Sequence, residues 1–397
     1  MEVYLSIFIA FSILYYFLPK EKSKYSYIFL VIALSIMAYN AVPNYTDDLY
    51  RYFMQLNNLR RGGWSVFQDM LKNDENGWGT FPVCGYYFYF ISRFPSNNYL
   101  QAITIFLAYG SMFLIVWKVS IRFNISKWYT YLMAFFILST FWFYDICSGV
   151  RNGLAFCIFG LCAYYFFVEK KHKFLCIIGF ILMSGLHSSV IMLDVILLLT
   201  IITGKSDSKL LTPFMFLGMA VGSSFIGYIS EFSNNDYILL IAGKAERHMG
   251  EVIDITQIGA SYASNIATFV ILLLLLIYFI PIIKKSKYKD DLFKYMKFIN
   301  FTMAFAFGSM FTSGLVFLRL VRFLMPSMVF ILIIIGLQIY SDNKDKKVKK
   351  QHSKSIIVNV NKEKNNIMVI NCLIFFYTVI YMVYACTLSS LIWLHFS

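Results

Sequence analysis

The stretch IATFVILLLLLIYFIPII, residues 266–283, decides the fold class of this chain. It carries no charged side chain, and a helix of about this length crosses ~30 Å of hydrocarbon. A lysine-rich segment, residues 284–297, follows it directly. Apolar runs of similar length recur along the sequence, so we expect an all-α polytopic membrane protein.

The composition of the whole chain agrees with this class. Of 397 residues, 59% are hydrophobic and 14% are charged, whereas about a quarter of the residues in soluble domains are charged. The net charge of +14 lies between the apolar runs, so we expect the lipid bilayer as a partner and no nucleic acid. The first run follows Glu2 and no basic segment, which predicts a retained helix and not a signal peptide.

The apolar runs predict about twelve transmembrane crossings or half-crossings. Their expected ranges are 2–18, 26–43, 98–118, 128–145, 150–168, 174–187, 188–203, 210–229, 266–283, 292–313, 314–340 and 366–390. The two shortest, 174–187 and 188–203, predict a broken hairpin that turns at 184–189. Irregular backbone at such depth is tolerated only where protein or a water-filled cavity surrounds it, so the hairpin indicates a site.

The segments between the runs fall into two alternating sets. One set is lysine-rich and comprises 19–25, 118–127, 169–173, 203–209, 284–297 and 341–365; the other comprises 44–97, 230–265 and turns near 146–150 and 313–316. The first set holds 25 of the 35 Lys and Arg residues, which places it in the cytoplasm by the positive-inside rule. We therefore expect one integral membrane domain (1–397) of the inner membrane, with outer loops at 44–97 and 230–265 and a cytoplasmic linker at 341–365.

The type of cation differs between the two faces. All but one of the cytoplasmic cations are lysines, whereas most outer cations are arginines: Arg51, Arg60, Arg61, Arg93, Arg151, Arg247, Arg319 and Arg322. The guanidinium is a planar, permanently charged fork that binds phosphate or carboxylate through two points. The outer face is thus expected to bind an anion, although single arginines also pair with lipid headgroups or nearby acids.

Three of these arginines lie at or within helices. Arg151 stands at the start of a crossing, where free N–H groups and the helix dipole favour an anion. Arg319 and Arg322 are three residues apart and share one helical face. Two like charges so close need an anion between or near them, so we expect all three to bind substrate, together with Arg51.

Candidates for acid–base chemistry are few. His187 lies at the tip of the broken hairpin, and imidazole titrates near neutrality, which suits a general base. Asp194 shares its helical face, and we expect it to orient the imidazole or to pair with an arginine. Asp47 and Asp48, in the first outer loop, are alternative catalytic acids or acceptor anchors.

No cofactor or metal site is expected. The seven cysteines are scattered without a C-x-x-C pair, which predicts neither a disulfide framework nor zinc. Walker, zincin, G-x-S-x-G and Rossmann motifs are absent from the sequence.

The order of these motifs resembles the EpsG family of bacterial exopolysaccharide and capsule polymerases, which are similar to Wzy-type polymerases. The resemblance is carried by Gly149-Val150-Arg151-Asn152-Gly153-Leu154-Ala155, a basic turn at 170–173, and His187-Ser188-Ser189. Asp47, Asp48 and Tyr52 resemble the acid-plus-tyrosine motif of that family. Its late arginine is matched by Arg319 or Arg322. Only residues 145–195 match closely.

The resemblance implies a glycosyltransferase of the GT-C-like helical class. It would polymerise polyprenyl-diphosphate-linked oligosaccharides into exopolysaccharide, capsule or O-antigen, without metal, at the outer face of the bacterial inner membrane. A chain-length regulator and a flippase are then expected partners. A transporter or flippase of lipid-linked saccharides, a membrane acyltransferase and a structural scaffold remain alternatives.

Overall fold

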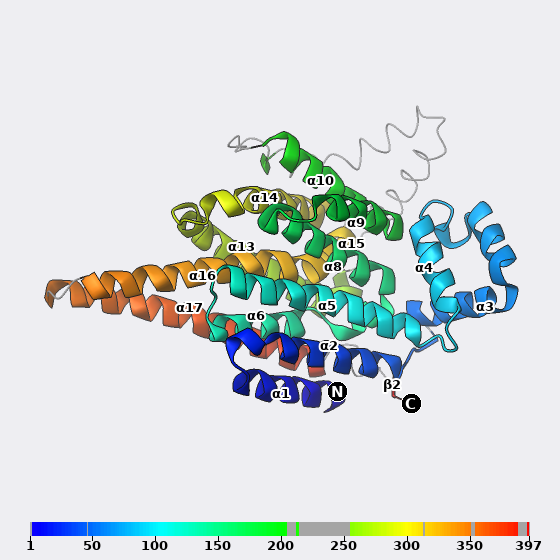
Figure 1. Cartoon of the computed structure of the whole chain (residues 1–397), viewed down its shortest axis with the longest axis horizontal. Helices are drawn as coiled ribbons and strands as arrows, with labels where there is room; N and C mark the ends of the chain where they lie inside the picture. The colour runs from blue at the N-terminus through cyan, green and yellow to red at the C-terminus, as the bar shows by residue number, and fades with distance from the viewer. Residues whose placement is uncertain are drawn as a thin grey trace.

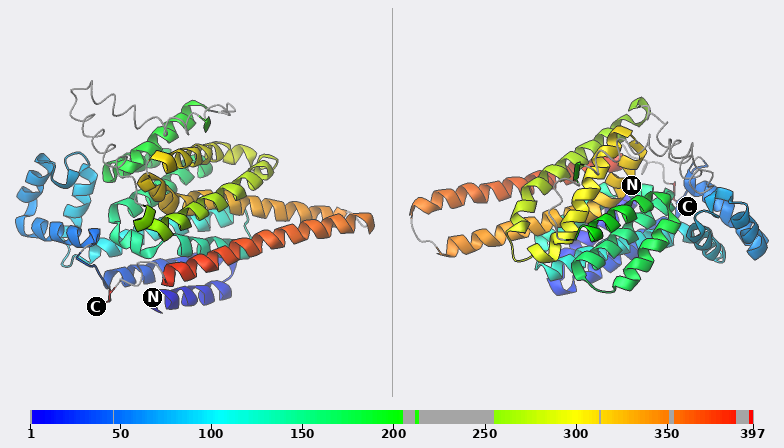
Figure 2. Two further views of the ribbon diagram at one scale, coloured as in Figure 1. Left: turned by 180° about the vertical axis from the view of Figure 1, so that it is seen from behind. Right: turned by 90° about the horizontal axis from the view of Figure 1, so that it is seen from above.

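A computed structural model describes residues 2–45, 47–204, 212–213, 255–312, 314–350, 354–387 and 395–396. This part of the chain is nearly all helical, as expected. The helices lie side by side in an elongated bundle (Figure 1). Two further views show a small helical lobe at one end and a long helical hairpin at the other (Figure 2).

The helices follow one another with short connections. The first half contains α1 (Glu2–Phe17), η1 (Lys20–Lys22), α2 (Lys24–Tyr39), α3 (Asp48–Lys72), η2 (Glu75–Gly77), α4 (Pro82–Ser92), α5 (Tyr99–Arg122), α6 (Lys127–Thr140), α7 (Phe143–Ser148), α8 (Val150–Tyr164), the π-helical turn η3 (Tyr165–Glu169), α9 (Lys173–Leu186), η4 (Ser188–Val190) and α10 (Ile191–Ile202). The second half contains α13 (Ile255–Lys284), α14 (Lys289–Thr312), α15 (Gly314–Arg319), the π-helical turn η5 (Leu320–Leu324), α16 (Met325–Lys350) and α17 (Lys354–Thr387). Strands β1 (Ala41–Val42) and β2 (His395–Phe396) form one antiparallel pair.

Three helical segments of the described chain are long and apolar enough to cross a membrane: Tyr99–Arg122, Val150–Glu169 and Ala263–Lys284. Shorter apolar helices include Glu2–Phe17, Lys173–Leu186 and Ser188–Ile202. Membrane association is therefore supported, whereas twelve crossings remain a prediction. The expected crossing at 210–229, apart from residues 212 and 213, and the expected outer loop up to residue 254 lie outside the described residues.

Two segments expected to be loops are largely helical. The first, 44–97, contains α3 and α4, which form the lobe at one end of the bundle (Figure 1); α3 bends at Gly63, whose φ of 64° suits glycine. The second, the expected linker 341–365, is occupied mostly by the ends of α16 and α17. Lysine and glutamate are good helix formers, so a polar composition predicted solvation correctly without predicting loss of helix.

The two sets of connecting segments gather at opposite ends of the bundle. The tips of α16 and α17 project from one end, and the lobe of α3 and α4 stands at the other (Figure 1). At the lysine-rich end, Lys20 donates to Asn124 at 2.8 Å and Lys170 pairs with Asp291 at 2.8 Å. Both contacts join segments of the lysine-rich set, as a consistent topology requires.

The expected crossing 128–145 is interrupted. Helix α6 ends at Thr140, Phe141 leaves helical geometry with ψ of 87°, and α7 begins at Phe143. The buried hydroxyl of Tyr109 donates to the carbonyl of Phe141 at 2.7 Å, which satisfies the backbone at the break. Because the residues at the break are apolar, hydropathy did not reveal it. The break allows α7 to turn toward α3.

Candidate functional site

A tight corner between α7 and α8 sets the position of the candidate site. The amide of Gly149 donates to the carbonyl of Asp145 at 2.9 Å. A Cβ at position 149 would lie 2.5 Å from that carbonyl oxygen, so the corner requires glycine. The close turn carries Asp145 on one side and Arg151, in the first turn of α8, on the other.

Arg151 is held by α3. Its Nε donates to the hydroxyl of Tyr52 at 3.2 Å, and its guanidinium lies 5.5 Å from the centre of the Tyr52 ring. Burial raises the pKa of the Tyr52 phenol, while the charge of Arg151 acts to lower it. Among the described residues Arg151 forms no ion pair with a carboxylate. A partly buried guanidinium whose neighbours are neutral is suited to an anionic ligand.

Asp47 lies at the residue preceding α3, and both of its carboxylate oxygens are engaged. Oδ2 accepts from the backbone N–H of Asn44 at 3.0 Å, and Oδ1 accepts from the hydroxyl of Tyr144 at 2.6 Å. These two bonds fix the orientation of the carboxylate before any substrate binds. Asp47 is therefore a positioned acid, next to the α7–α8 corner.

The late arginines reach the same corner from η5 and the end of α15. Arg322 forms an ion pair with Asp145 at 3.0 Å and lies 5.3 Å from the ring centre of Trp142. Arg319 donates to the hydroxyl of Ser189 in η4 at 3.2 Å. Helix α8 packs against both η4 and η5, so the three arginines come from neighbouring elements.

His187 occupies the break between α9 and η4. Its backbone is extended, with φ of −149° and ψ of 126°, and its side chain is 9% exposed. Its Nδ1 accepts from the backbone N–H of Ser189 at 3.1 Å. An accepting nitrogen carries no proton, so the neutral ring holds its proton on Nε2. This tautomer favours a hydrogen-bond donor and disfavours the general base that we expected.

Two expected contributions lie apart from this corner. Arg51 pairs with Asp48 on α3, where the two side chains are 68% and 49% exposed. Their mutual contact and exposure favour a surface pair over substrate binding and catalysis. Asp194 accepts from the hydroxyl of Ser184 across the α9–α10 hairpin, so its described partner is a serine and not an imidazole or guanidinium.

The structure also adds residues that sequence reasoning had not selected. Tyr144 and Asp145 were hidden at the end of an expected crossing, although an acid beside a tyrosine at a helix end was a usable signal. Asn152 follows Arg151 in α8, and its buried Oδ1 has no hydrogen-bond partner among the described residues. A buried acceptor without a donor is costly, which indicates a ligand N–H or O–H at this point.

Together these residues form the outer polar cluster. It comprises Asp47, Tyr52, Tyr144, Asp145, Arg151, Asn152, His187, Ser189, Arg319 and Arg322. Within the described residues, no group of three His, Cys, Asp or Glu side chains is arranged to hold a metal ion. No family model, curated protein or solved structure matches the chain.

Proposed function

We propose that this protein is a membrane glycosyltransferase that polymerises polyprenyl-diphosphate-linked oligosaccharide repeats at the outer face of the bacterial inner membrane. One observation carries the proposal: Arg151 is partly buried at the start of α8, has neutral partners, and lies on the element that packs against Arg319 and Arg322. The resemblance to EpsG-type polymerases supports the same assignment.

The proposed reaction needs an anion site more than a cofactor. The acceptor hydroxyl oxygen bonds to the anomeric carbon of the growing chain while the bond from that carbon to the diphosphate oxygen breaks. The electron pair leaves with the polyprenyl diphosphate, so negative charge grows on the leaving group. Fixed guanidinium groups stabilise that growing charge more than the bound ground state. We assign this role to Arg151 and Arg319.

The hydroxyl proton needs an acceptor, and we assign it to Asp47. Its carboxylate is oriented by Asn44 and Tyr144, and carboxylates act as bases when held within hydrogen-bond reach of the proton. His187 then serves as a donor to an anionic oxygen, in keeping with its tautomer. Arg322, already neutralised by Asp145, positions the α7–α8 corner.

The deciding experiment is reconstitution of the pure protein with lipid-linked repeats. We expect a ladder of longer glycans on gels, with free polyprenyl diphosphate formed once per linkage. A matched control is Arg51→Gln, which removes an exposed arginine of the same lobe, against Arg151→Gln. Repeats that cross the bilayer without lengthening would instead identify a flippase, and repeats that gain an acyl group would identify an acyltransferase.

A further inference from the structure

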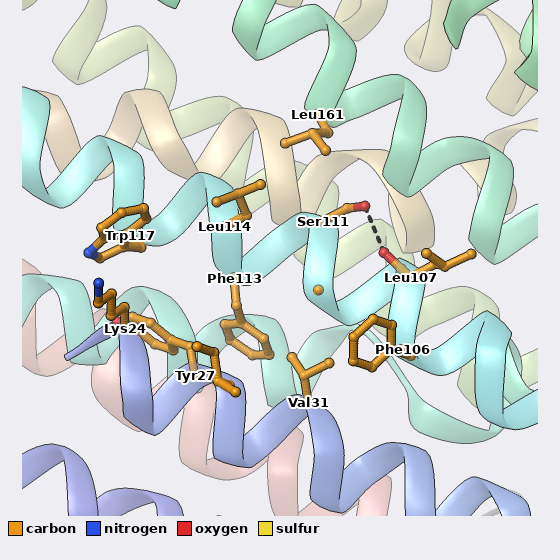
Figure 3. A pocket seen from close by; sticks show the side chains of 12 residues that line it. Lys24, Tyr27, Val31, Phe106, Leu107, Ser111, Phe113, Leu114, Trp117 and Leu161 are labelled. Carbon is orange, nitrogen blue, oxygen red and sulfur yellow. Dashed lines mark hydrogen bonds between the residues drawn. The ribbon is translucent and has the colours of Figure 1, made fainter. Parts of the chain in front are cut away.

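A groove of about 430 Å³ runs along the outside of the bundle between α2 and α5, far in sequence from the outer polar cluster. Its wall is formed by apolar side chains, among them Tyr27, Val31, Phe113 and Leu161 (Figure 3). The hydroxyl of Ser111 donates to the carbonyl of Leu107 at 2.6 Å, so it adds little polarity. The groove therefore suits a hydrocarbon chain.

The polar groups of the groove meet at one end. There the indole nitrogen of Trp117 and the ammonium of Lys24 approach each other (Figure 3), and the ammonium lies 5.9 Å from the centre of the Trp117 ring. The Nε1 of Trp117 is buried and has no acceptor among the described residues. The ammonium of Lys118 lies 4.9 Å from the same ring.

These groups are all donors and two are cations, so the missing partner is an acceptor with negative charge. In the described chain no salt bridge engages Lys24 or Lys118. An unsatisfied buried donor costs free energy, and a phosphate oxygen would satisfy it while balancing the two ammonium groups. A phosphate with an attached hydrocarbon chain matches both parts of the groove.

The length and position of the groove select the class of lipid. From Trp117 to Phe106, α5 rises by roughly 16 Å at about 1.5 Å per residue, which is near half of the ~30 Å hydrocarbon thickness. The polar end belongs to the lysine-rich set that the charge distribution places in the cytoplasm. Phe106 and Leu107 are exposed on the outside of the bundle, so a lipid enters sideways from the bilayer.

We infer that this groove binds one anionic glycerophospholipid of the cytoplasmic leaflet, with its phosphate between Lys24 and Trp117 and an acyl chain along α5. The site is separate from the proposed transferase centre. It gives the bundle a lipid-dependent contact between α2 and α5, two helices that also pack directly against each other.

The test is native mass spectrometry of the full-length protein in detergent, titrated with phosphatidylglycerol or phosphatidylcholine. We expect one tightly held phosphatidylglycerol, with phosphatidylcholine bound at least about fivefold more weakly, as the loss of one cation–headgroup interaction predicts. Lys24→Gln and Trp117→Phe should each weaken phosphatidylglycerol binding to a similar extent. Lys287→Gln removes an exposed lysine outside the groove and should leave binding unchanged.

A second variant tests the acyl chain. A Cβ at Gly110 would meet only Val31, at 3.8 Å, so Gly110→Leu fills open groove space and should displace the lipid without disturbing Lys24. Equal binding of both lipids, or full phosphatidylglycerol binding in both Lys24→Gln and Trp117→Phe, would overturn the inference. So would stronger competition by a polyprenyl phosphate, because the groove would then belong to the lipid carrier.

Discussion

The hydroxyl of Tyr144 donates a 2.6 Å hydrogen bond to Asp47, a residue 97 positions earlier in the chain. The next residue after Tyr144, Asp145, holds Arg322 in an ion pair. Two consecutive side chains of α7 thus join the entrance of α3 to η5. The short helix α7, which separates from α6 at an apolar break, therefore organises the candidate site.

The first prediction concerns Arg151. Arg151→Lys keeps the charge but loses the planar fork and the Nε bond to Tyr52, so we expect glycan polymerisation to fall by about 100-fold. Protein level in the membrane should not change. Arg51→Lys is the matched control and should retain activity. Wild-type ladders from the Arg151 variant would remove this residue from diphosphate binding.

The second prediction separates the two roles of His187. His187→Ala should reduce polymerisation by about 100-fold. His187→Gln supplies an amide N–H near the position of Nε2, so it should retain clearly more activity than alanine if the ring is a donor. An amide does not accept a proton at neutral pH. Equal loss in both variants, measured as glycan length per unit time, would restore the general-base role.

The third prediction compares the adjacent acids. Asp47→Asn keeps the shape of the side chain but removes the proposed proton acceptor, so polymerisation should fall by about 100-fold or more. Asp48→Asn breaks only an exposed pair with Arg51 and should have little effect. The assay is the same glycan ladder. If Asp48 proves essential and Asp47 does not, the proposed base is wrong.

The fourth prediction concerns the Asp145–Arg322 pair, whose side chains are 16% and 23% exposed. Asp145→Asn leaves a partly buried guanidinium without its counter-ion, so we expect a loss of about 1–3 kcal/mol in unfolding free energy. The double variant Asp145→Asn, Arg322→Gln should lose less than the sum of the single variants. Thermal unfolding in detergent measures this coupling, and strict additivity would contradict it.

The fifth prediction concerns pH. Hydrogen bonding to Lys170, aided by the charges of Lys170 and Arg122, lowers the pKa of Asp291 below its usual value of 3.8. A lowered folded-state pKa adds stability above the unfolded pKa, and that stability is lost as pH falls through the folded pKa. The difference in melting temperature between wild type and Asp291→Asn should be small, because the pair is exposed, and should shrink below about pH 4. An unchanged difference in strong acid would exclude this linkage.

The sequence predicted the helical class and several helix ends well, because apolar runs and lysine-rich turns report directly on burial and charge. The turn of the broken hairpin at His187 is one such case, with α9 ending at Leu186. It did not predict the break after Thr140 or the helices of the lobe. At those places the composition on both sides is similar, and tertiary hydrogen bonds decide where a helix stops.

The candidate site was predicted only in part. Arg151 and His187 stand out because a charge or an imidazole at a helix end is unusual in an apolar chain. Their partners do not, because an ordinary tyrosine such as Tyr52 acquires a role only through an approach across 99 residues. The tautomer of His187 likewise depends on one backbone N–H, and no sequence pattern reports that contact.

The placement of α7 also has a consequence for biogenesis. The network runs from Asp47 through Tyr144 and Asp145 to Arg322, so it closes only after the ribosome has delivered more than three quarters of the chain to the bilayer. A partly inserted polypeptide has no assembled centre to engage the carrier lipid. Synthesis itself thereby delays the onset of any activity until the bundle is nearly whole.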